Sequence, residues 1–226
     1  MQNMLTGKRV LVTQATEFMG PAFCEVFAEQ GATVIPSDRE LSTPGNAQSI
    51  VQEAGEFDVL VANLSMMAPS TPAAEVEEAE WREVFAALVD PLPGLVKAAA
   101  PMMSKRGGGK ILVVGSASAL RGMKRASTYS AARGAQVAYV QAVGVELAPL
   151  NIQMNAIAQN FVDNPTYFPA DVQANPKFQA RLAREVPLGR LVSAREDAQF
   201  AAYLCSSAAD CFVGQVFPVC GGWVAR

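Results

Sequence analysis

A serine, a tyrosine and an arginine occur at a spacing that could support acid–base chemistry. Ser116 follows an apolar run, Tyr129 comes 13 positions later (129 − 116 = 13), and Arg133 comes four positions after the tyrosine. If the segment that holds the last two is helical, Tyr129 and Arg133 share a helix face, because residues four apart are neighbours on a helix. A serine at the end of a strand could face them across a gap. The pattern would then gather a hydrogen-bond donor, a base and a fixed cation around one point.

The chemistry of such a group follows from its charges. An ordinary tyrosine has a pKa of about 10, which is too high for a base at neutral pH. A neighbouring cation favours the phenolate form, and arginine keeps its charge under all relevant conditions. Tyr129 is therefore a candidate general base supported by Arg133, and Ser116 would hold the oxygen that loses its proton. Ser118 is a rival for the serine role, but Ser116 is nearer the strand end. The alternative is an ordinary half-buried tyrosine beside a surface arginine, because the motif is short.

Composition limits both the fold and the chemistry. The chain has 226 residues, of which 50% are hydrophobic and 17% are charged, which fits one domain with a substantial core. Its net charge of −3 gives no basic footprint for nucleic acid, and we see no apolar run that approaches the ~18 residues of a membrane helix. The sequence has no histidine, which excludes Ser-His-Asp and Cys-His catalysis and most zinc sites. We expect no metal, no nucleic acid and no membrane as partners.

The cysteines and the N-terminal segment indicate a compartment. The four cysteines show no Cys-x-x-Cys spacing, which is typical of reduced thiols rather than of a disulfide framework or a metal site. The first residues lead straight into a strand pattern without the features of a signal peptide. We therefore expect a cytoplasmic protein.

Alternating strand and helix patterns predict how the candidate residues are positioned. The strand patterns are continuous apolar runs, as in parallel sheets that are buried on both faces. We expect strands at 8–13, 32–36, 58–63, 110–114, 151–156 and 215–219, and helical sequence at 20–30, 43–55, 72–105, 127–148, 176–184 and 194–206. A loop is expected between the fifth strand and residue 175. The pattern predicts a single α/β domain over residues 1–226, a doubly wound parallel sheet in three layers.

The turn between the first strand and the first helix, residues 13–20, departs from the pattern of a phosphate-binding loop. A dinucleotide-binding turn needs glycines so that the backbone can approach the pyrophosphate. Gly20 is present, but Gln14 and Phe18 stand where small residues would be expected. One interpretation is that the cofactor cavity has been closed and reused for something smaller. The other is that Phe18 belongs to the core and that an unusual turn still binds NAD.

Taken together, these features give the whole chain a resemblance to the short-chain dehydrogenase/reductase superfamily, which implies a Rossmann-like fold. Besides the serine and the tyrosine, Asn63 resembles the asparagine of the third strand, and residues 187–190 and 221–222 resemble further family stretches. Two departures stand out: Arg133 replaces the usual lysine, and the first turn has lost its glycines. Both departures characterise one branch, the halohydrin dehalogenases, and the chain resembles that branch from end to end.

This resemblance implies a lyase that needs no cofactor. Halohydrin dehalogenases convert vicinal halo-alcohols into an epoxide, a halide and a proton, and in reverse they open epoxides with small anions such as azide, cyanide or nitrite. By resemblance, Ser116 would bind the substrate hydroxyl, Tyr129 would remove its proton and Arg133 would tune the tyrosine. The resemblance also implies a homotetramer, a dimer of dimers, in which the small residues of the helix at 127–148 build an interface.

The halide site is implied by resemblance at residues 158–162, after the fifth strand. In such a turn, backbone N–H groups bind an anion without any formal charge. Some relatives carry a proline where Gln159 stands, so this position departs from their pattern. Residues 164–169 would cover the site. The residues implied in halide binding are Phe18, Gln159, Asn160, Phe161 and Val162.

Several alternatives remain open at the level of sequence. The chain could be an NAD(P)-dependent reductase of the same superfamily with an atypical turn, or a non-catalytic binding protein on a degenerate dehydrogenase fold. Residues 158–162 could be an ordinary solvated loop. Leu64, Met66 and Met67 could be pocket walls or simply core.

Overall fold

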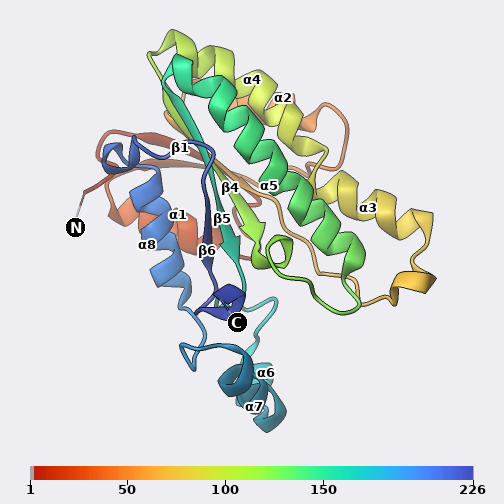
Figure 1. The fold of residues 1–226 in the computed structure, drawn as a ribbon. Coiled ribbons are helices and arrows are strands. Elements are labelled where there is room, and N and C mark those ends of the chain that lie inside the picture. The colour runs from red at the N-terminus through yellow and green to blue at the C-terminus, as the bar shows by residue number, and fades with distance from the viewer. Residues whose placement is uncertain (1–2, 226) are drawn as a thin grey trace.

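A six-stranded parallel sheet forms the middle layer of the computed structural model, which describes residues 3–225 (Figure 1). The strand order is β2-β1-β3-β4-β5-β6. The chain starts inside the sheet, turns to one edge and then crosses back, so the order reverses between β1 and β3. The strands are β1 (Arg9–Thr13), β2 (Thr33–Ser37), β3 (Val59–Asn63), β4 (Gly109–Ser116), β5 (Ile152–Gln159) and β6 (Val216–Val219).

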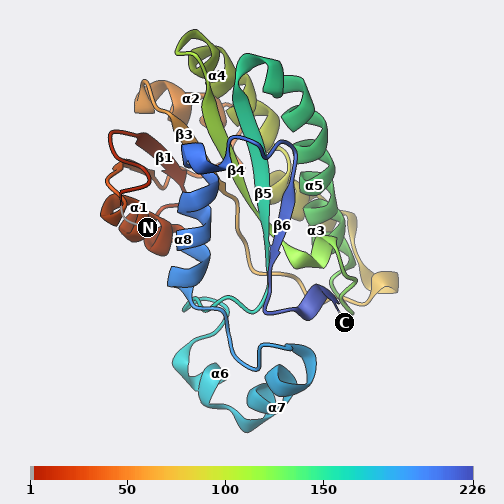
Figure 2. The ribbon, with the colours of Figure 1, turned by 60° about the vertical axis from the view of Figure 1, so that its left-hand side comes forward.

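Helices cover both faces of the sheet (Figure 2). One face carries α1 (Gly20–Glu29) and α8 (Ala194–Leu204), which pack against each other. The other face carries α2 (Asn46–Ala54), α3 (Glu78–Leu88), α4 (Pro91–Lys105) and α5 (Ser127–Leu147). This arrangement confirms the predicted three-layer, doubly wound α/β fold.

Residues of one strand alternate between two cores. In β1, Leu11 packs with the α2–α5 side, whereas Val10 packs with the side of α1 and α8. In β3, Leu60 and Val59 divide in the same way. Side chains of a strand point alternately to its two faces, so burial of both faces requires continuous apolar sequence. This requirement explains the apolar runs from which the strands were predicted.

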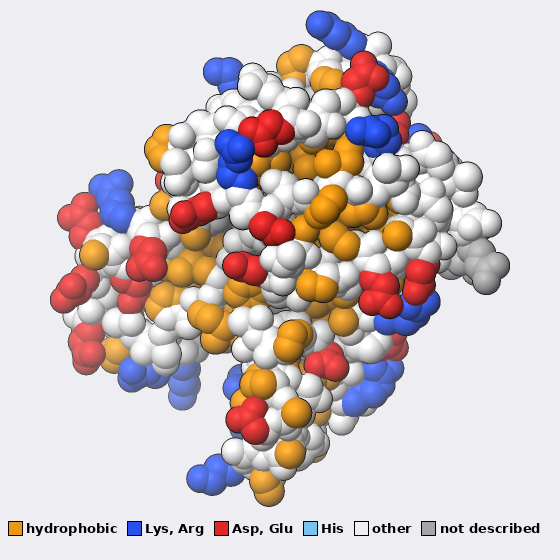
Figure 3. Space-filling model, turned by 180° about the vertical axis from the view of Figure 1, so that it is seen from behind, with side chains coloured by type: hydrophobic (Ala, Val, Ile, Leu, Met, Phe, Trp, Pro, Cys, Tyr) orange, Lys and Arg blue, Asp and Glu red, His pale blue; other side chains and the backbone are white. Residues whose placement is uncertain are grey.

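A small lobe lies beyond the carboxyl ends of the strands. It consists of α6 (Ala170–Ala174) and α7 (Pro176–Glu185), and we call it the α6–α7 lobe. In Figure 3, seen from behind, it projects at the lower end, and hydrophobic side chains gather in the middle of that face among charges of both signs. The loop that we expected between the fifth strand and residue 175 is shorter than predicted at both ends. β5 continues to Gln159 because it pairs there with β4 and β6, and α6 occupies the last part of the segment.

One expectation from composition, that no apolar run approaches the length of a membrane helix, is wrong for Glu78–Lys105. By length and composition alone it could cross a membrane, with a mean hydropathy of 1.3 in its most apolar window. In the structure it forms α3 and α4, with Pro91 at the start of α4, and 44% of that window is buried inside the protein. Leu92, Leu95 and Met103 of α4 belong to the core. A core helix passes the same compositional test, and the buried side chains indicate that role here.

Candidate active site

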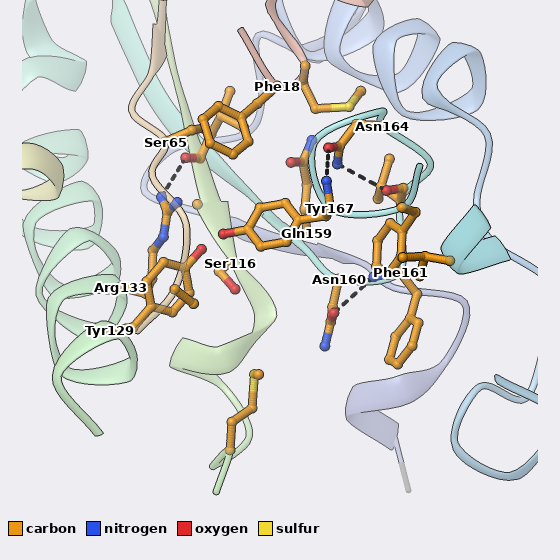
Figure 4. Close-up of a pocket in the computed structure, with 18 of the residues that line it drawn as sticks. Phe18, Ser65, Ser116, Tyr129, Arg133, Gln159, Asn160, Phe161, Asn164 and Tyr167 are labelled. Atoms are coloured by element: carbon orange, nitrogen blue, oxygen red, sulfur yellow. Dashed lines mark hydrogen bonds between the residues drawn. The ribbon is translucent and has the colours of Figure 1, made fainter. Parts of the chain in front are cut away.

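A cavity of about 280 Å³ lies at the carboxyl ends of β4 and β5, beside α5 (Figure 4). In doubly wound sheets, ligands bind outside the carboxyl ends of the strands, near the point where the strand order reverses. All the site residues singled out from the sequence line this one cavity: Phe18, Ser116, Tyr129, Arg133, Gln159, Asn160, Phe161 and Val162. The fold therefore brings together side chains from the first turn, β4, α5 and the end of β5.

Arg133 is a buried cation that is held only by neutral oxygens. Its side chain sits on α5, and the residue is 3% exposed. Nη1 donates to the carbonyl oxygens of Leu64 (2.9 Å) and Val114 (3.1 Å) and to Oε1 of Gln136 (3.0 Å). Among residues 3–225 no carboxylate pairs with it, and its Nε is buried without a partner. A buried charge without a counter-ion is costly, so the site favours a negative charge nearby.

Tyr129 is the group next to that charge. The Cζ atom of Arg133 lies 4.9 Å from the centroid of the Tyr129 ring, and the tyrosine is itself buried. Both residues occur in the first turns of α5, which begins at Ser127, so the helix fixes their common face. The guanidinium contacts the face of the ring, and its hydrogen bonds go instead to Leu64 after β3, to Val114 of β4 and to Gln136 of α5.

Ser116 completes the group at the end of β4. Its Oγ accepts hydrogen bonds from the backbone N–H of Ser118 (3.2 Å) and from Oγ of Ser118 (3.0 Å). The Ser116 hydroxyl hydrogen is therefore available to a ligand in the cavity. Ser118 is buried behind Ser116 and does not line the cavity. Of the two candidate serines, Ser116 is the one that a ligand can reach.

Tyr167 is a second phenol at the site, and the sequence indicated only the segment that holds it. Its ring packs against Phe18, with centroids 5.6 Å apart, and its hydroxyl donates to the carbonyl oxygen of Met66 at 2.6 Å. Burial raises the pKa of Tyr167, and the neighbouring Tyr129 hydroxyl raises it further. Tyr167 thus remains protonated, and its one hydroxyl hydrogen is donated to Met66 rather than to Tyr129.

The segment predicted to bind halide forms hydrogen bonds within the protein. The N–H of Asn160 donates to the carbonyl oxygen of Val219 (3.1 Å), and the N–H of Phe161 donates to the side-chain oxygen of Asn160 (2.9 Å). Phe161 has a φ of 52°, the left-handed conformation found in anion-binding turns. Two of the backbone groups expected to bind an anion are therefore occupied. In the described part of the chain, neither Nδ2 of Asn160 nor the backbone N–H of Val162 has an acceptor, so both remain as donors.

The side chain of Gln14 closes the first turn, residues 13–20. Nε2 of Gln14 donates to the carbonyl oxygen of Ser65 (3.1 Å), and Oε1 of Gln14 accepts from the N–H of Ser65 (2.6 Å). Asn63 donates to the carbonyl oxygen of Gln14 (3.0 Å). The turn is thereby tied to the end of β3. Gly20 is still required, because a Cβ there would lie 2.2 Å from the carbonyl oxygen of Gln14.

Several backbone N–H groups of this turn are also engaged, and those groups are not free to bind a pyrophosphate. Ala15 donates to the carbonyl oxygen of Ser37, and Thr16 donates to Oδ1 of Asp38 at 2.8 Å. Phe18, with a φ of 47°, places its ring in the cavity. The residues present do not fit a bound dinucleotide. Within residues 3–225, no three His, Cys, Asp or Glu side chains gather as a metal site would require.

Three candidate wall residues do not line the cavity. Leu64 is fully buried in the core, Met66 packs on that core, and Met67 is 54% exposed. Leu64 and Met66 act instead through backbone carbonyl oxygens that hold Arg133 and Tyr167. Lining residues that sequence reasoning did not identify individually are Met19, Ser65, Ala68, Val114, Gly115, Met123, Asn164, Tyr167, Phe168, Val172, Phe178 and Arg181. Most come from connecting segments, where no periodic pattern marks which side chains point inward.

Comparisons with known proteins agree on the fold and differ in chemistry. A family model described as enoyl-(acyl carrier protein) reductase matches residues 6–224. The chain is 31% identical to cis-4-hydroxycyclohexanecarboxylate dehydrogenase of Sinomonas cyclohexanicum, over 95% of this chain and 96% of that protein. A solved structure described as a dehalogenation enzyme superposes with a TM-score of 0.91 at 30% identity, covering 97% of this chain and 99% of that one.

A second solved structure shows what the same fold accommodates elsewhere. L-sorbose reductase from Gluconobacter frateurii, complexed with NADPH and L-sorbose, also superposes with a TM-score of 0.91, at 22% identity and over the full length of both chains. At this identity only the fold is shared. The fold alone therefore does not decide whether this chain binds a dinucleotide.

Proposed function

The chain belongs to the short-chain dehydrogenase/reductase family, and from that premise we propose that it is a halohydrin dehalogenase that works without a nucleotide. The observation that carries the proposal is the Gln14–Ser65 pair, which fills the first turn while Ser116, Tyr129 and Arg133 still line an open cavity. A filled cofactor turn combined with a retained acid–base group argues for a reaction without hydride transfer. The similarity to a solved dehalogenation enzyme supports this choice over the reductases.

The reaction requires one proton transfer and one displacement. Ser116 donates its free hydroxyl hydrogen to the substrate oxygen, and Tyr129 takes the proton from that oxygen. The oxygen then attacks the neighbouring carbon, a C–O bond forms, and the C–halogen bond breaks with its electron pair leaving on the halide. Nothing is oxidised or reduced. Arg133 stabilises the negative charge that Tyr129 carries as the base, because no carboxylate in the described residues competes for it.

The halide leaves toward the end of β5. The ring of Phe161 lies on this side of the cavity, which Phe18 also lines, and the Asn160 side chain offers Nδ2 as a donor (Figure 4). Weakly hydrated anions such as bromide tolerate a partly apolar surround better than strongly hydrated ones. In the reverse direction the same place would hold azide, cyanide or nitrite while an epoxide is opened.

We also propose a homotetramer in the cytoplasm. The outer surface of α5 carries exposed small residues, Ala131, Ala138 and Ala142, followed by Val145, which is 68% exposed. Small side chains permit close helix packing. The four cysteines are free thiols, as expected in a reducing compartment. Light scattering of the wild type and of Ala138→Glu tests the assembly, and a monomeric wild type would contradict it.

The test of the function is direct. The protein is incubated with 1-bromo-2-propanol or a similar small bromo-alcohol without added cofactor, and bromide and acid are measured together. We expect equal amounts of bromide, acid and epoxide. In the reverse test, azide and the epoxide should give an azido-alcohol.

Titration of the protein with NADH and NADPH provides the control. No binding is expected, because the Gln14 amide and Phe18 occupy the place of the pyrophosphate. Micromolar binding of either nucleotide, together with no bromide release from any small bromo-alcohol, would assign the chain to the reductases of its family.

A further inference from the structure

Asp197 is a buried carboxyl group that the reaction above does not use. It lies in the first half of α8, is 0% exposed, and its Oδ1 has no hydrogen-bond partner. Its Oδ2 accepts a single hydrogen bond, from Nε2 of Gln159 at 2.6 Å. Buried carboxyl groups normally have several partners or an opposing charge. The solitary bond to Gln159 therefore calls for a role connected with that residue.

Gln159 connects this carboxyl group to the cavity. It is the last residue of β5 and lines the cavity next to Asn160 (Figure 4). Its amide has two ends of opposite character, a donor at Nε2 and an acceptor at Oε1. Nε2 is turned to Asp197, and Oε1 has no donor among the described residues. The end that remains for a ligand is the acceptor, which repels an anion.

We propose that Asp197 is a positioning residue that decides which end of the Gln159 amide faces the cavity. As a carboxylate, Asp197 can only accept, so it holds Nε2 and leaves Oε1 to the cavity. As a neutral acid it can donate to Oε1, and the amide then turns its N–H donors to the ligand. Anion binding would be weak in the first state and strong in the second. The inference rests on the proposed function, because the anion is the halide of that reaction.

Protonation of Asp197 is accessible near neutral pH. Burial raises the pKa of its carboxyl group to about 7, and the hydrogen bond from Gln159 opposes this rise. The charged groups on the surrounding elements have partners of their own: Arg195 of α8 pairs with Glu29 of α1, and Glu196 of α8 pairs with Arg190. Asp163, after the β5 end, accepts from Gln173. The negative charge of Glu25 in α1 helps to raise the pKa of Arg195.

The experiment measures bromide binding rather than turnover. Trp223 reports on the site, because its ring lies 6.4 Å from that of Phe161. All proteins carry Trp81→Phe, which removes the other tryptophan, and sodium sulfate holds the ionic strength constant. For the otherwise wild-type chain, we expect the bromide dissociation constant to rise about fivefold from pH 6 to pH 8.5, the size of one hydrogen bond's net contribution.

Variants at both positions separate positioning from a simple charge effect. Asp197→Asn can donate to Oε1 at every pH, so its bromide affinity should stay at the tight limit without pH dependence. In Gln159→Met the amide is absent, so the pH dependence should vanish and Asp197→Asn should add nothing. Persistence of the pH dependence in Gln159→Met would overturn the inference while leaving the halide site intact. Absence of any bromide effect on the wild type at either pH would overturn the halide site and the inference together.

Discussion

Two segments that line the cavity differ in their hydrogen bonding. Residues 13–20, after β1, direct the Gln14 amide and several backbone N–H groups to partners within the chain. Residues 116–133, from the end of β4 into α5, present a free hydroxyl hydrogen, a phenol and a cation without a counter-ion. The first segment directs most of its polar groups to partners within the chain, whereas the second leaves polar groups open to the cavity. The function that we propose uses the second segment and requires no cofactor in the first.

The largest expected effect comes from the phenol of the second segment. Tyr129→Phe should lower the rate of bromide release about 10³-fold, since it removes the proton acceptor and leaves the ring beside Arg133 in place. Tyr167→Phe is the matched control, because that hydroxyl donates to Met66 and stays protonated. A Tyr129→Phe enzyme as active as the control would exclude Tyr129 as the base.

The serine comes next. Ser116→Ala should lower kcat about 10²-fold, the usual cost of one donor to the reacting oxygen. Ser118→Ala should cost less, because the Ser118 hydroxyl donates to Ser116 and does not line the cavity. The comparison is made by steady-state kinetics on one bromo-alcohol. A larger loss of kcat in Ser118→Ala than in Ser116→Ala would assign the binding of the substrate oxygen to Ser118.

Replacement of the cation should have a smaller effect. Arg133→Lys keeps the charge but loses the planar contact with the Tyr129 ring and part of the contacts to Leu64, Val114 and Gln136. We expect about a tenfold loss of kcat, equivalent to about one hydrogen bond. Circular dichroism checks that the variant is folded. An unchanged kcat would show that the guanidinium geometry is unimportant and that a charge alone suffices.

The smallest expected effect tests the first segment. Phe18→Gly should not create NAD binding, because Gln14 still bridges to Ser65 with both ends of its amide. Fluorescence titration with NADH measures this. Gln14→Gly combined with Phe18→Gly is the comparison, since it removes both obstacles. Nucleotide binding by the single variant would mean that the ring alone closes the site.

Sequence reasoning located the fold and most of the candidate residues for physical reasons. Two buried sheet faces impose continuous apolar runs, so the strands were visible without an alignment. Tyr129 and Arg133 could be paired because helical spacing is local. The end of β5 and helix α6 were missed. The strand is extended by pairing with β4 and β6, and the helix is only five residues long.

The contacts that distinguish the site were beyond the reach of sequence. Gln14 meets Ser65 across 51 positions, and Gln159 meets Asp197 across 38. Nothing periodic links such pairs, and a glutamine or an aspartate at these positions has no preferred partner until the sheet is assembled. Neither pair could have been proposed from residue type alone.

Local patterns were sufficient to predict the layered sheet, the grouping of Ser116, Tyr129 and Arg133, and the unusual first turn, because burial and helix geometry act over short stretches of sequence. Only the tertiary structure decided that the Gln14 amide closes that turn, that Arg133 is left without a counter-ion, and that a buried carboxyl group holds Gln159. Hydrogen bonds and desolvation depend on which distant groups become neighbours, and that is settled only when the chain packs.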